Sequence, residues 1–513
     1  MDKNFYITTP IYYPSAKPHM GHAYSSIIAD FFARFKKIDG FNVHFLTGTD
    51  EHGLKIQRAA ENKGVDTLNF CDEISQTFRD LSKTLNLTNT DFIRTTEDRH
   101  KKSVQHLWNE LEKNDDIYLS KYSGWYSVSD EAFYNEDEIE ETDGKKFAIS
   151  SKSTVEWVDE ESYFFRLSKW EKPLLEFYNK NPNFISPESR KNEVISFVKS
   201  GLKDLSVSRK SFSWGIKVPN NDEHIIYVWL DALTNYISAL NYPNKKDNLY
   251  KNFWPASVHL IGKDILRFHA VYWPAFLLAA KIDLPKRIYG HGWILSGDEK
   301  MSKSKGNILD PLQIIDEYGL DPLRYYLIKE VSFGNDGNIS QERLEDCINS
   351  DLANNFGNLC QRVTAFAFKN CEGKVPDKIK FTKDDLDILN KFENSLDEIR
   401  SKIDNQDINY YIDFIVNSLF EANKYFNDQE PWKKKEDIIR LNSIVYTSLE
   451  IIRKVSFLLF PIIPETALKA LKIFNLKEND INFSSISKNE FLLKGSNINK
   501  IDILFQKIEK NND

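Results

Sequence analysis

The pattern of apolar and polar residues predicts alternating strands and helices at the start of the chain. Residues 4–12 form an apolar run typical of a buried strand, and residues 19–37 carry apolar side chains at helical spacing. A second strand is expected over Asn42–Leu46, then a turn over Thr47–Asp50 and a helix over Leu54–Lys63. This alternation indicates a parallel, doubly wound sheet with ligands at the carboxyl ends of its strands.

The pattern changes from about residue 118. Alternation over Tyr122–Tyr134, followed by an acidic run and Asp143-Gly144, predicts a hairpin-rich insertion, and helical periodicity returns at 162–205. The runs Ile225–Trp229 and His259–Gly262 resemble core strands. We therefore expect residues 220–290 to resume the parallel sheet.

Beyond about residue 340 the pattern is helical throughout, with breaks at Pro431 and Pro461. The long amphipathic segments are 385–403, 408–427 and 436–459. The expected fold is thus α/β: a Rossmann-like sheet split by an inserted α+β domain, then an all-α helical bundle. Its expected parts are 1–117 (first half of the nucleotide-binding domain), 118–222 (insertion), 223–290 (second half), 291–340 (a lysine-loop region) and 341–513 (helical domain).

Composition narrows the class of protein. The chain has 513 residues, 41% hydrophobic and 28% charged, as in soluble proteins of two to four domains. No apolar run approaches the roughly 20 residues that span a membrane, and the N-terminus resembles neither a signal nor an Arg-rich presequence. We expect a cytoplasmic protein, with a bacterial source favoured and an organellar one left open. The net charge of −8 argues mildly against a nonspecific nucleic-acid coat but permits a local basic patch.

The histidine pair His19 and His22 is the first candidate for chemistry. Three positions apart, the two side chains lie on one face at the start of the predicted helix, and Gly21 leaves room beside them. A helix N-terminus also offers N–H groups and partial positive charge, which suit phosphate. Taken alone, such a pair is more often two ordinary surface histidines. A zinc pair is disfavoured because no third ligand is evident at a suitable spacing.

The segment Lys300-Met301-Ser302-Lys303-Ser304 is the second candidate. Lysines separated by small hydroxyl residues are typical of a flexible loop that closes on phosphate, and lysine is a compact cation for a departing pyrophosphate. A solvated basic turn is the alternative for this segment alone. Together, in this order, the two motifs suggest one ATP site built from distant segments.

The two motifs resemble the signature of class I aminoacyl-tRNA synthetases, and further segments resemble the methionyl-tRNA synthetase family within that class. These segments are Thr9–Tyr13, Gly48–Gly53, Tyr227–Ala232, Ile261–Asp264, His269–Pro274 and Glu430–Trp432. The resemblance covers essentially the whole chain. It implies that methionine and ATP form methionyl-adenylate, and that the methionyl group passes to the 3′ end of initiator and elongator tRNA(Met).

The resemblance also implies roles for the two motifs. His19 and His22 are expected to stabilise the transition state at the ATP phosphates, while Lys300 and Lys303 hold pyrophosphate bridged by Mg²⁺. The implied ATP-binding residues are His19, Gly21, His22, Lys300, Met301, Ser302 and Lys303.

The amino-acid pocket must recognise a thioether, which forms almost no hydrogen bonds, so shape and sulfur–aromatic contact have to select it. Asp50 is expected to accept the ammonium group. Plain core packing is the alternative for Trp229 and Trp273, and Leu233 stands where the family often has proline. The resemblance places these residues around methionine: Ile11, Tyr13, Asp50, Trp229, Ala232, Tyr236, Ile265, His269 and Trp273.

The helical bundle resembles the anticodon-binding domain of the family. Asn358, Arg362 and Trp432 match positions that read the CAU anticodon, where an indole can stack on a base and Asn or Arg can bond its edge. A surface pair on a helix and a buried tryptophan are equally open alternatives for these residues.

Two absences bear on cofactors and partners. The four cysteines are scattered, and none lies in 118–160, where many family members bind zinc through cysteine, so we expect no structural zinc. The chain ends at 513, shortly after the bundle, so a monomer is the expectation.

Two other functions have to be weighed. A class I synthetase for leucine, valine or cysteine is disfavoured by the aromatic pocket, the lack of a large editing insertion and the missing zinc ligands. A non-catalytic tRNA-binding paralogue predicts eroded motifs, yet His19, His22, Lys300 and Lys303 are all present.

Overall fold

The computed structural model describes residues 3–14, 17–127, 130, 132–142, 144–296, 299–300 and 310–509. The chain divides into two compact units. A sheet unit combines Asn4–Pro18 with Val43–His291, and a helical unit combines Met1–Lys3 and His19–Asn42 with Gly292–Asp513.

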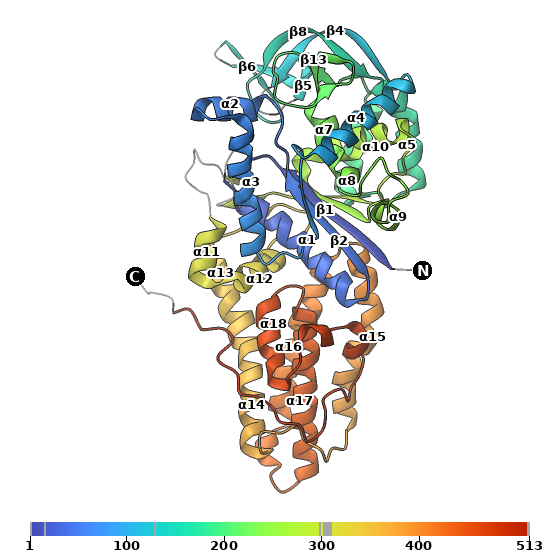
Figure 1. Ribbon diagram of the computed structural model, residues 1–513. Coiled ribbons are helices and arrows are strands. Elements are labelled where there is room, and N and C mark those ends of the chain that lie inside the picture. The colour runs from blue at the N-terminus through green and yellow to red at the C-terminus, as the bar shows by residue number, and fades with distance from the viewer. Residues whose placement is uncertain are drawn as a thin grey trace. The chain divides into compact units, whose positions relative to one another are not determined.

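A six-stranded sheet with the order β3-β2-β1-β14-β15-β9 forms the centre of the sheet unit (Figure 1). The pairs β2–β3, β1–β14, β14–β15 and β15–β9 all run parallel. In the register of β1 with β14, Thr8 lies opposite His259, a residue 251 positions later in the chain. The strands are β1 (Asn4–Tyr12), β2 (Asn42–Thr49), β3 (Asp91–Arg94), β9 (Ile185–Ser186), β14 (Val258–Gly262) and β15 (Ile288–His291).

Helices cover both faces of this sheet, as the side chains of β3 show. Phe92 belongs to an apolar cluster with α2 and α3, whereas Ile93 belongs to a larger cluster with α4, α7, α8 and α10. Because successive side chains of a strand point to opposite faces, the two clusters lie on opposite sides of β3. The predicted doubly wound sheet is therefore confirmed. The helices are α2 (Leu54–Lys63), α3 (Thr67–Thr84), α4 (Asp98–Lys113), α7 (Val228–Leu233), α8 (Asn235–Ser238) and α10 (Trp273–Ala279).

The predicted strand-rich insertion is also confirmed. Its main feature is a long antiparallel ladder between β4 and β8, which lie side by side (Figure 1) and pair from Ile117 with Phe165 to Tyr126 with Glu156. The elements of this region are β4 (Ile117–Ser127), β5 (Ala132–Tyr134), β6 (Ile139–Thr142), β7 (Lys145–Ala148), β8 (Glu156–Phe165), α5 (Glu171–Lys180), α6 (Glu188–Lys199) and β10 (Leu205–Ser206).

The prediction of a core strand over Ile225–Trp229 is wrong. β13 (Asn221–Ile226) pairs with β11 (Ser208–Arg209) and β12 (Lys217–Val218) in a separate three-stranded sheet, and α7 begins at Val228. A short apolar run does not by itself distinguish a buried strand from a buried helix.

The predicted turn over Thr47–Asp50 is also wrong, because β2 continues to Thr49. Gly48 lies within the strand, and a Cβ atom added there would come within 2.0 Å of the carbonyl oxygen of Ile93 in β3. The glycine is required by close strand packing rather than by a turn.

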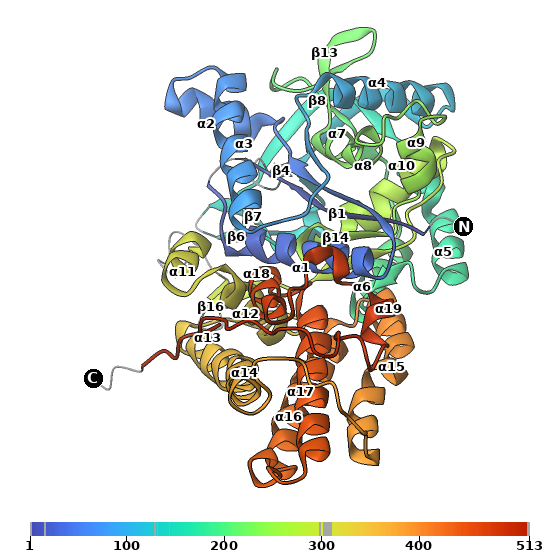
Figure 2. The ribbon, with the colours of Figure 1, turned by 60° about the horizontal axis from the view of Figure 1, so that its bottom comes forward.

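The helical unit contains the predicted bundle. In both views (Figures 1 and 2) α14, α16 and α17 lie side by side. The prediction of helix throughout fails after α19 (Phe483–Ile486), since residues 487–509 contain no helix. The remaining helices are α1 (Met20–Ile38), α11 (Pro311–Tyr318), α12 (Leu320–Glu330), α13 (Gln341–Cys347), α14 (Asn358–Asn370), α15 (Lys383–Asp404), α16 (Ile408–Asp428), α17 (Ile438–Leu459) and α18 (Pro464–Leu471).

A buried ion cluster ties α1 to this unit. The Asp30 carboxylate accepts hydrogen bonds from Arg34 Nε at 2.8 Å and from Arg324 Nη2 at 2.7 Å, and Asp30 and Arg324 are fully buried. Arg324 Nε also donates to the carbonyl oxygen of Ile462, between α17 and α18. One guanidinium therefore joins the helix that follows His19 to the bundle.

We predict that Asp30→Asn lowers the free energy of unfolding by about 3–5 kcal/mol, because two arginines lose their carboxylate partner in a buried site. Urea unfolding at constant pH measures the change. Lys37→Ala on the same helix is the control. Its exposed partner Glu478 is 3.5 Å away, so less than about 1 kcal/mol should be lost. Equal losses for the two variants would contradict the assigned role of Asp30.

Candidate active site

The residues predicted to surround methionine converge on one part of the sheet unit. Ile11, Tyr13, Trp229 and Ile265 are partly buried against the larger apolar cluster, which also contains Tyr236 and Trp273. The site residues come from the carboxyl ends of β1 and β2, from α7 and α8, and from the chain that follows β14. This is the edge at which parallel sheets bind ligands.

A hydrogen bond between Tyr236 and His269 lies within this group. His269 Nδ1 is 3.0 Å from the carbonyl oxygen of Ile265, which can only accept, so this nitrogen carries a proton. His269 Nε2 is 2.7 Å from the Tyr236 hydroxyl. Burial lowers the pKa of His269 to about 4 and raises the pKa of Tyr236. At neutral pH the ring is therefore neutral, and the Tyr236 hydroxyl donates to Nε2.

Aromatic rings surround this pair. The Trp229 ring stacks on Phe268 at 3.7 Å between centroids and an interplanar angle of 5°. Tyr236 stacks on His259 at 4.0 Å, and its ring lies 6.2 Å from that of Trp273. Such a group of rings offers the polarizable surface that a thioether contacts well.

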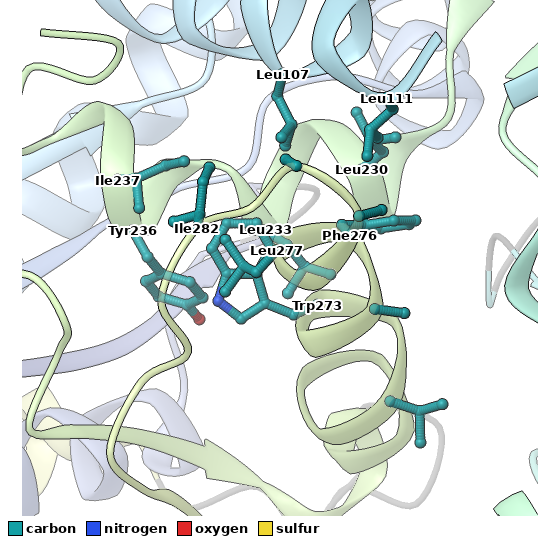
Figure 3. Close-up of a cluster of buried hydrophobic side chains, with 14 of the residues drawn as sticks. Leu107, Leu111, Leu230, Leu233, Tyr236, Ile237, Trp273, Phe276, Leu277 and Ile282 are labelled. Carbon is teal, nitrogen blue, oxygen red and sulfur yellow. The ribbon is translucent and has the colours of Figure 1, made fainter. Parts of the chain in front are cut away.

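Trp273 is the residue most clearly engaged in core packing. Its side chain has no exposed surface, and Figure 3 shows it beside Leu233, Tyr236 and Leu277 in a cluster of buried hydrophobic side chains. Leu233 is itself 1% exposed. Leu233, which stands where the resemblance leads one to expect proline, therefore fills the core beside the aromatic group.

Asp50 lies in a segment whose position is fixed by its neighbours. Its backbone N–H donates to the carbonyl oxygen of Tyr12 at 2.9 Å. The next residue, Glu51, is fully buried, and its carboxylate accepts hydrogen bonds from Arg94 Nε at 2.7 Å and Nη2 at 3.0 Å. The Glu51 carbonyl oxygen accepts from Trp214 Nε1 at 2.6 Å. Contacts from Tyr12, Arg94 and Trp214 thus hold the backbone that carries Asp50 at the end of β2.

The histidine pair forms a reciprocal cap at the start of α1. His19 Nδ1 accepts from the backbone N–H of Gly21 at 3.1 Å, and His22 Nδ1 accepts from the N–H of His19 at 3.1 Å. The two rings stack at 3.8 Å between centroids. Burial, with the neighbouring His19 as a second cause, lowers the pKa of His22 well below its usual value. With Nδ1 accepting, the proton of each neutral ring is on Nε2, and both rings can act as hydrogen-bond donors.

Gly21 has a local reason for being glycine. A Cβ atom there would lie 3.0 Å from Cε1 of His19, so a larger residue would push the capping ring aside. The lysine loop falls largely outside the described residues. Met301, Ser302 and Lys303 are not among them, and of Lys300 only the backbone is described, in β17 (Glu299–Lys300).

The predicted anticodon residues lie near one another in the helical unit. Asn358 is exposed at the start of α14, and Arg362 Nη2 of the same helix donates to Asn427 Oδ1 at 2.5 Å. The Arg362 guanidinium is 5.6 Å from the ring of Phe426, which lies 6.3 Å from the ring of Trp432. Trp432 is 41% exposed, so the alternative of a buried tryptophan does not apply.

Some residues of these sites were missed by sequence reasoning. Glu51 lies within the segment Gly48–Gly53, and Phe268 directly precedes the segment His269–Pro274, yet nothing in the sequence indicated the partner of either residue. Nothing in the sequence indicated Asn427, which accepts a hydrogen bond from Arg362. In the part of the chain that the structure describes, no group of three or more His, Cys, Asp or Glu side chains could hold a metal ion, and no helix is long and apolar enough to cross a membrane.

A parallel sheet with a strand-rich insertion, a capped histidine pair and a following helical domain together define a class I aminoacyl-tRNA synthetase. The chain belongs to the methionyl family of that class. Residues 5–145 and 144–364 match the family described as "tRNA synthetases class I (M)", and residues 375–513 match "Anticodon binding domain of methionyl tRNA ligase".

Individual relatives agree with this assignment. The chain is 50% identical to the methionine–tRNA ligase of Rickettsia felis over 99% of both chains, and 48% identical to that of Brucella suis over 94% of both. Its structure resembles that of Mycobacterium tuberculosis methionyl-tRNA synthetase in complex with methionyl-adenylate. The TM-score is 0.95 at 44% identity, over 98% of this chain and 99% of the other.

We predict that neutral His269 makes the protein sensitive to acid. Its pKa is about 4 in the folded protein and near 6.5 when unfolded, so the unfolded chain binds more protons as the pH falls between these values, and stability falls too. Between pH 7 and pH 5 this difference in proton binding should lower the free energy of unfolding by about 2 kcal/mol. Urea unfolding of the unmodified protein and of His269→Gln at both pH values measures this. The same loss in both proteins would contradict the prediction.

Proposed function

We propose that the protein activates L-methionine with ATP to methionyl-adenylate and then transfers the methionyl group to the 3′ end of initiator and elongator tRNA(Met). The observation that carries this proposal is the aromatic group around the Tyr236–His269 hydrogen bond, with the Asp50 carboxylate on the same sheet unit. A small set of rings suits a thioether, and a carboxylate suits the ammonium group.

We assign recognition of methionine mainly to shape and to contact with the aromatic rings. Leucine and isoleucine lack the unbranched, polarizable side chain that rings such as Trp229 contact well. The Tyr236 proton is already donated to His269, so the phenol oxygen can present only lone pairs to a ligand. A polar analogue that donates a hydrogen bond would therefore lose little binding energy at this oxygen, so hydrogen bonding does not reject it. We assign selection mainly to the fit of the rings.

Catalysis of adenylate formation needs no protein nucleophile. A methionine carboxylate oxygen forms a bond to the α-phosphorus of ATP. The bond from that phosphorus to the oxygen that bridges to the β-phosphate breaks, and pyrophosphate leaves with this oxygen and its electron pair. Neutral His19 and His22 donate from Nε2 to phosphate oxygens as charge develops, and Lys300 and Lys303 hold the pyrophosphate. ATP enters with Mg²⁺ on its phosphates, so this metal belongs to the substrate.

We assign reading of the anticodon to Asn358, Arg362 and Trp432. The exposed indole of Trp432 offers a stacking surface, and Phe426 connects it to the Arg362 guanidinium. Asn427 fixes that guanidinium by accepting its hydrogen bond, which leaves other N–H groups of the side chain to meet a base edge.

We further propose that the protein acts as a cytoplasmic monomer without structural zinc. The absence of cysteine from residues 118–160 supports the last point, which elemental analysis of the purified protein can test. The five-part division of the chain at residues 117, 222, 290 and 340 remains a prediction.

Methionine-dependent exchange of pyrophosphate into ATP tests the proposed function. We expect exchange with methionine and little or none with leucine or cysteine, because only the thioether fits the ring-lined site. A folded protein that shows no methionine-dependent exchange would contradict the proposal.

We predict that Trp432→Ala spares pyrophosphate exchange but lowers kcat/KM for tRNA(Met) about 10- to 100-fold, as expected when a base loses 1–3 kcal/mol of stacking. Phe420→Ala is the control, since this aromatic residue of α16 is 65% exposed and outside the Arg362 cluster. It should leave both reactions unchanged. If exchange and charging fell equally in Trp432→Ala, the anticodon role would be wrong.

A further inference from the structure

Asp231 is a fully buried carboxylate within the helix that carries two of the predicted methionine contacts. It lies in α7, between Trp229 and Ala232. Asp231 Oδ2 is 2.7 Å from His52 Nδ1, and Oδ1 is 2.7 Å from His100 Nε2. These partners are 179 and 131 positions away in the chain. Because an ionised carboxylate only accepts, each imidazole donates to it.

His52 connects this carboxylate to the segment that carries Asp50. It lies two residues after Asp50, and its backbone carbonyl oxygen accepts the hydroxyl proton of Tyr13 at 2.9 Å. Its ring packs edge-on against Trp214, with 5.8 Å between centroids. One residue therefore links Tyr13 and Asp50, both predicted methionine contacts, to α7.

His100 connects the same carboxylate to a different part of the molecule. It lies in α4, and its Nδ1 is 2.9 Å from the hydroxyl of Ser238 in α8. Both His52 and His100 are buried, at 4% and 0% side-chain exposure. The contacts of His52 and His100 with Asp231 are thus alike in chemistry and burial, but they join Asp231 to different segments of the chain.

We infer that the hydrogen bond from His52 to Asp231 positions Asp50 relative to Trp229 and thereby sets the affinity for methionine. The inference rests on the proposed function and adds a positioning residue that touches no substrate. The bond crosses from the segment that receives the ammonium group to the helix that carries the side-chain pocket. Charge-assisted hydrogen bonds between buried groups are short and directional, so this contact restricts how far the two halves of the pocket can separate.

The hydrogen bond from His100 to Asp231 supplies a matched control. Removal of either imidazole leaves the same Asp231 carboxylate one partner short, so the structural cost should be similar. Only the loss of His52 removes the link between α7 and the segment that carries Asp50. A role in general stability would affect both variants alike, whereas a positioning role would separate them.

The experiment compares His52→Ala with His100→Ala in methionine-dependent pyrophosphate exchange, with the KM for methionine, the KM for ATP and kcat measured separately. We expect His52→Ala to raise the KM for methionine about 10- to 100-fold, the usual effect of losing a supporting contact, with the KM for ATP changed less than about twofold. For His100→Ala we expect less than about a threefold change in either KM, despite a similar loss of stability in urea.

A second pair keeps the test decisive if an alanine variant does not fold. The side-chain amide of asparagine places an N–H group close to the position of Nδ1, whereas that of glutamine reaches toward Nε2. His52→Asn should therefore keep a KM for methionine near that of the unmodified protein, and His52→Gln should raise it.

Several results would overturn the inference. Equal increases in the KM for methionine in the two alanine variants would show a merely structural role, and an unchanged KM in His52→Ala would show no role. Equal values of the KM for methionine in His52→Asn and His52→Gln would also overturn the inference. In each of these cases the unmodified protein still exchanges pyrophosphate. If it shows no methionine-dependent exchange, the proposed function fails, and the inference that rests on it fails with it.

Discussion

The parallel pairing of β1 with β14 is the contact on which the sheet unit depends. It places Thr8 beside His259, where the Thr8 hydroxyl and His259 Nδ1 are 2.9 Å apart, and the Tyr6 hydroxyl donates to the carbonyl oxygen of Tyr236 at 2.8 Å. All four residues are buried. The strand-rich insertion separates β1 from β14 in the chain. Without this pairing, the two sides of the predicted methionine pocket would not face each other.

Buried polar groups then set the finer geometry. Glu51, Asp231 and Asp30 are carboxylates removed from water, and each has cationic or imidazole partners from distant elements. Such a group is costly unless its partners are correctly placed, so it disfavours alternative arrangements of the segments it joins. His269 acts in the opposite sense. It stays neutral, and its single available proton decides which way the Tyr236 hydroxyl points.

The sequence predicted the elements with long and regular patterns. The apolar spacing of residues 19–37 and 408–427 matches α1 and α16 to within a residue, since an amphipathic helix must repeat its apolar face over several turns. The predictions from sequence failed where the apolar pattern was short. Ile225–Trp229 straddles the end of β13 and the start of α7, and the two-residue strand β9 has no pattern at all. Burial on all sides removes the alternation that would distinguish strand from helix.

The sequence by itself determined the class of chemistry and the residues that the family resemblance implies, because the histidine pair and the lysine motif are each local features of the chain. Only the tertiary structure decided the partners: Phe268 on Trp229, Arg94 on Glu51, and His52 on Asp231. These contacts join residues whose spacing along the chain has no relation to their spacing in the fold. A hydrogen bond between two buried side chains exists only after the strands and helices between them have packed, so one sequence alone does not reveal it.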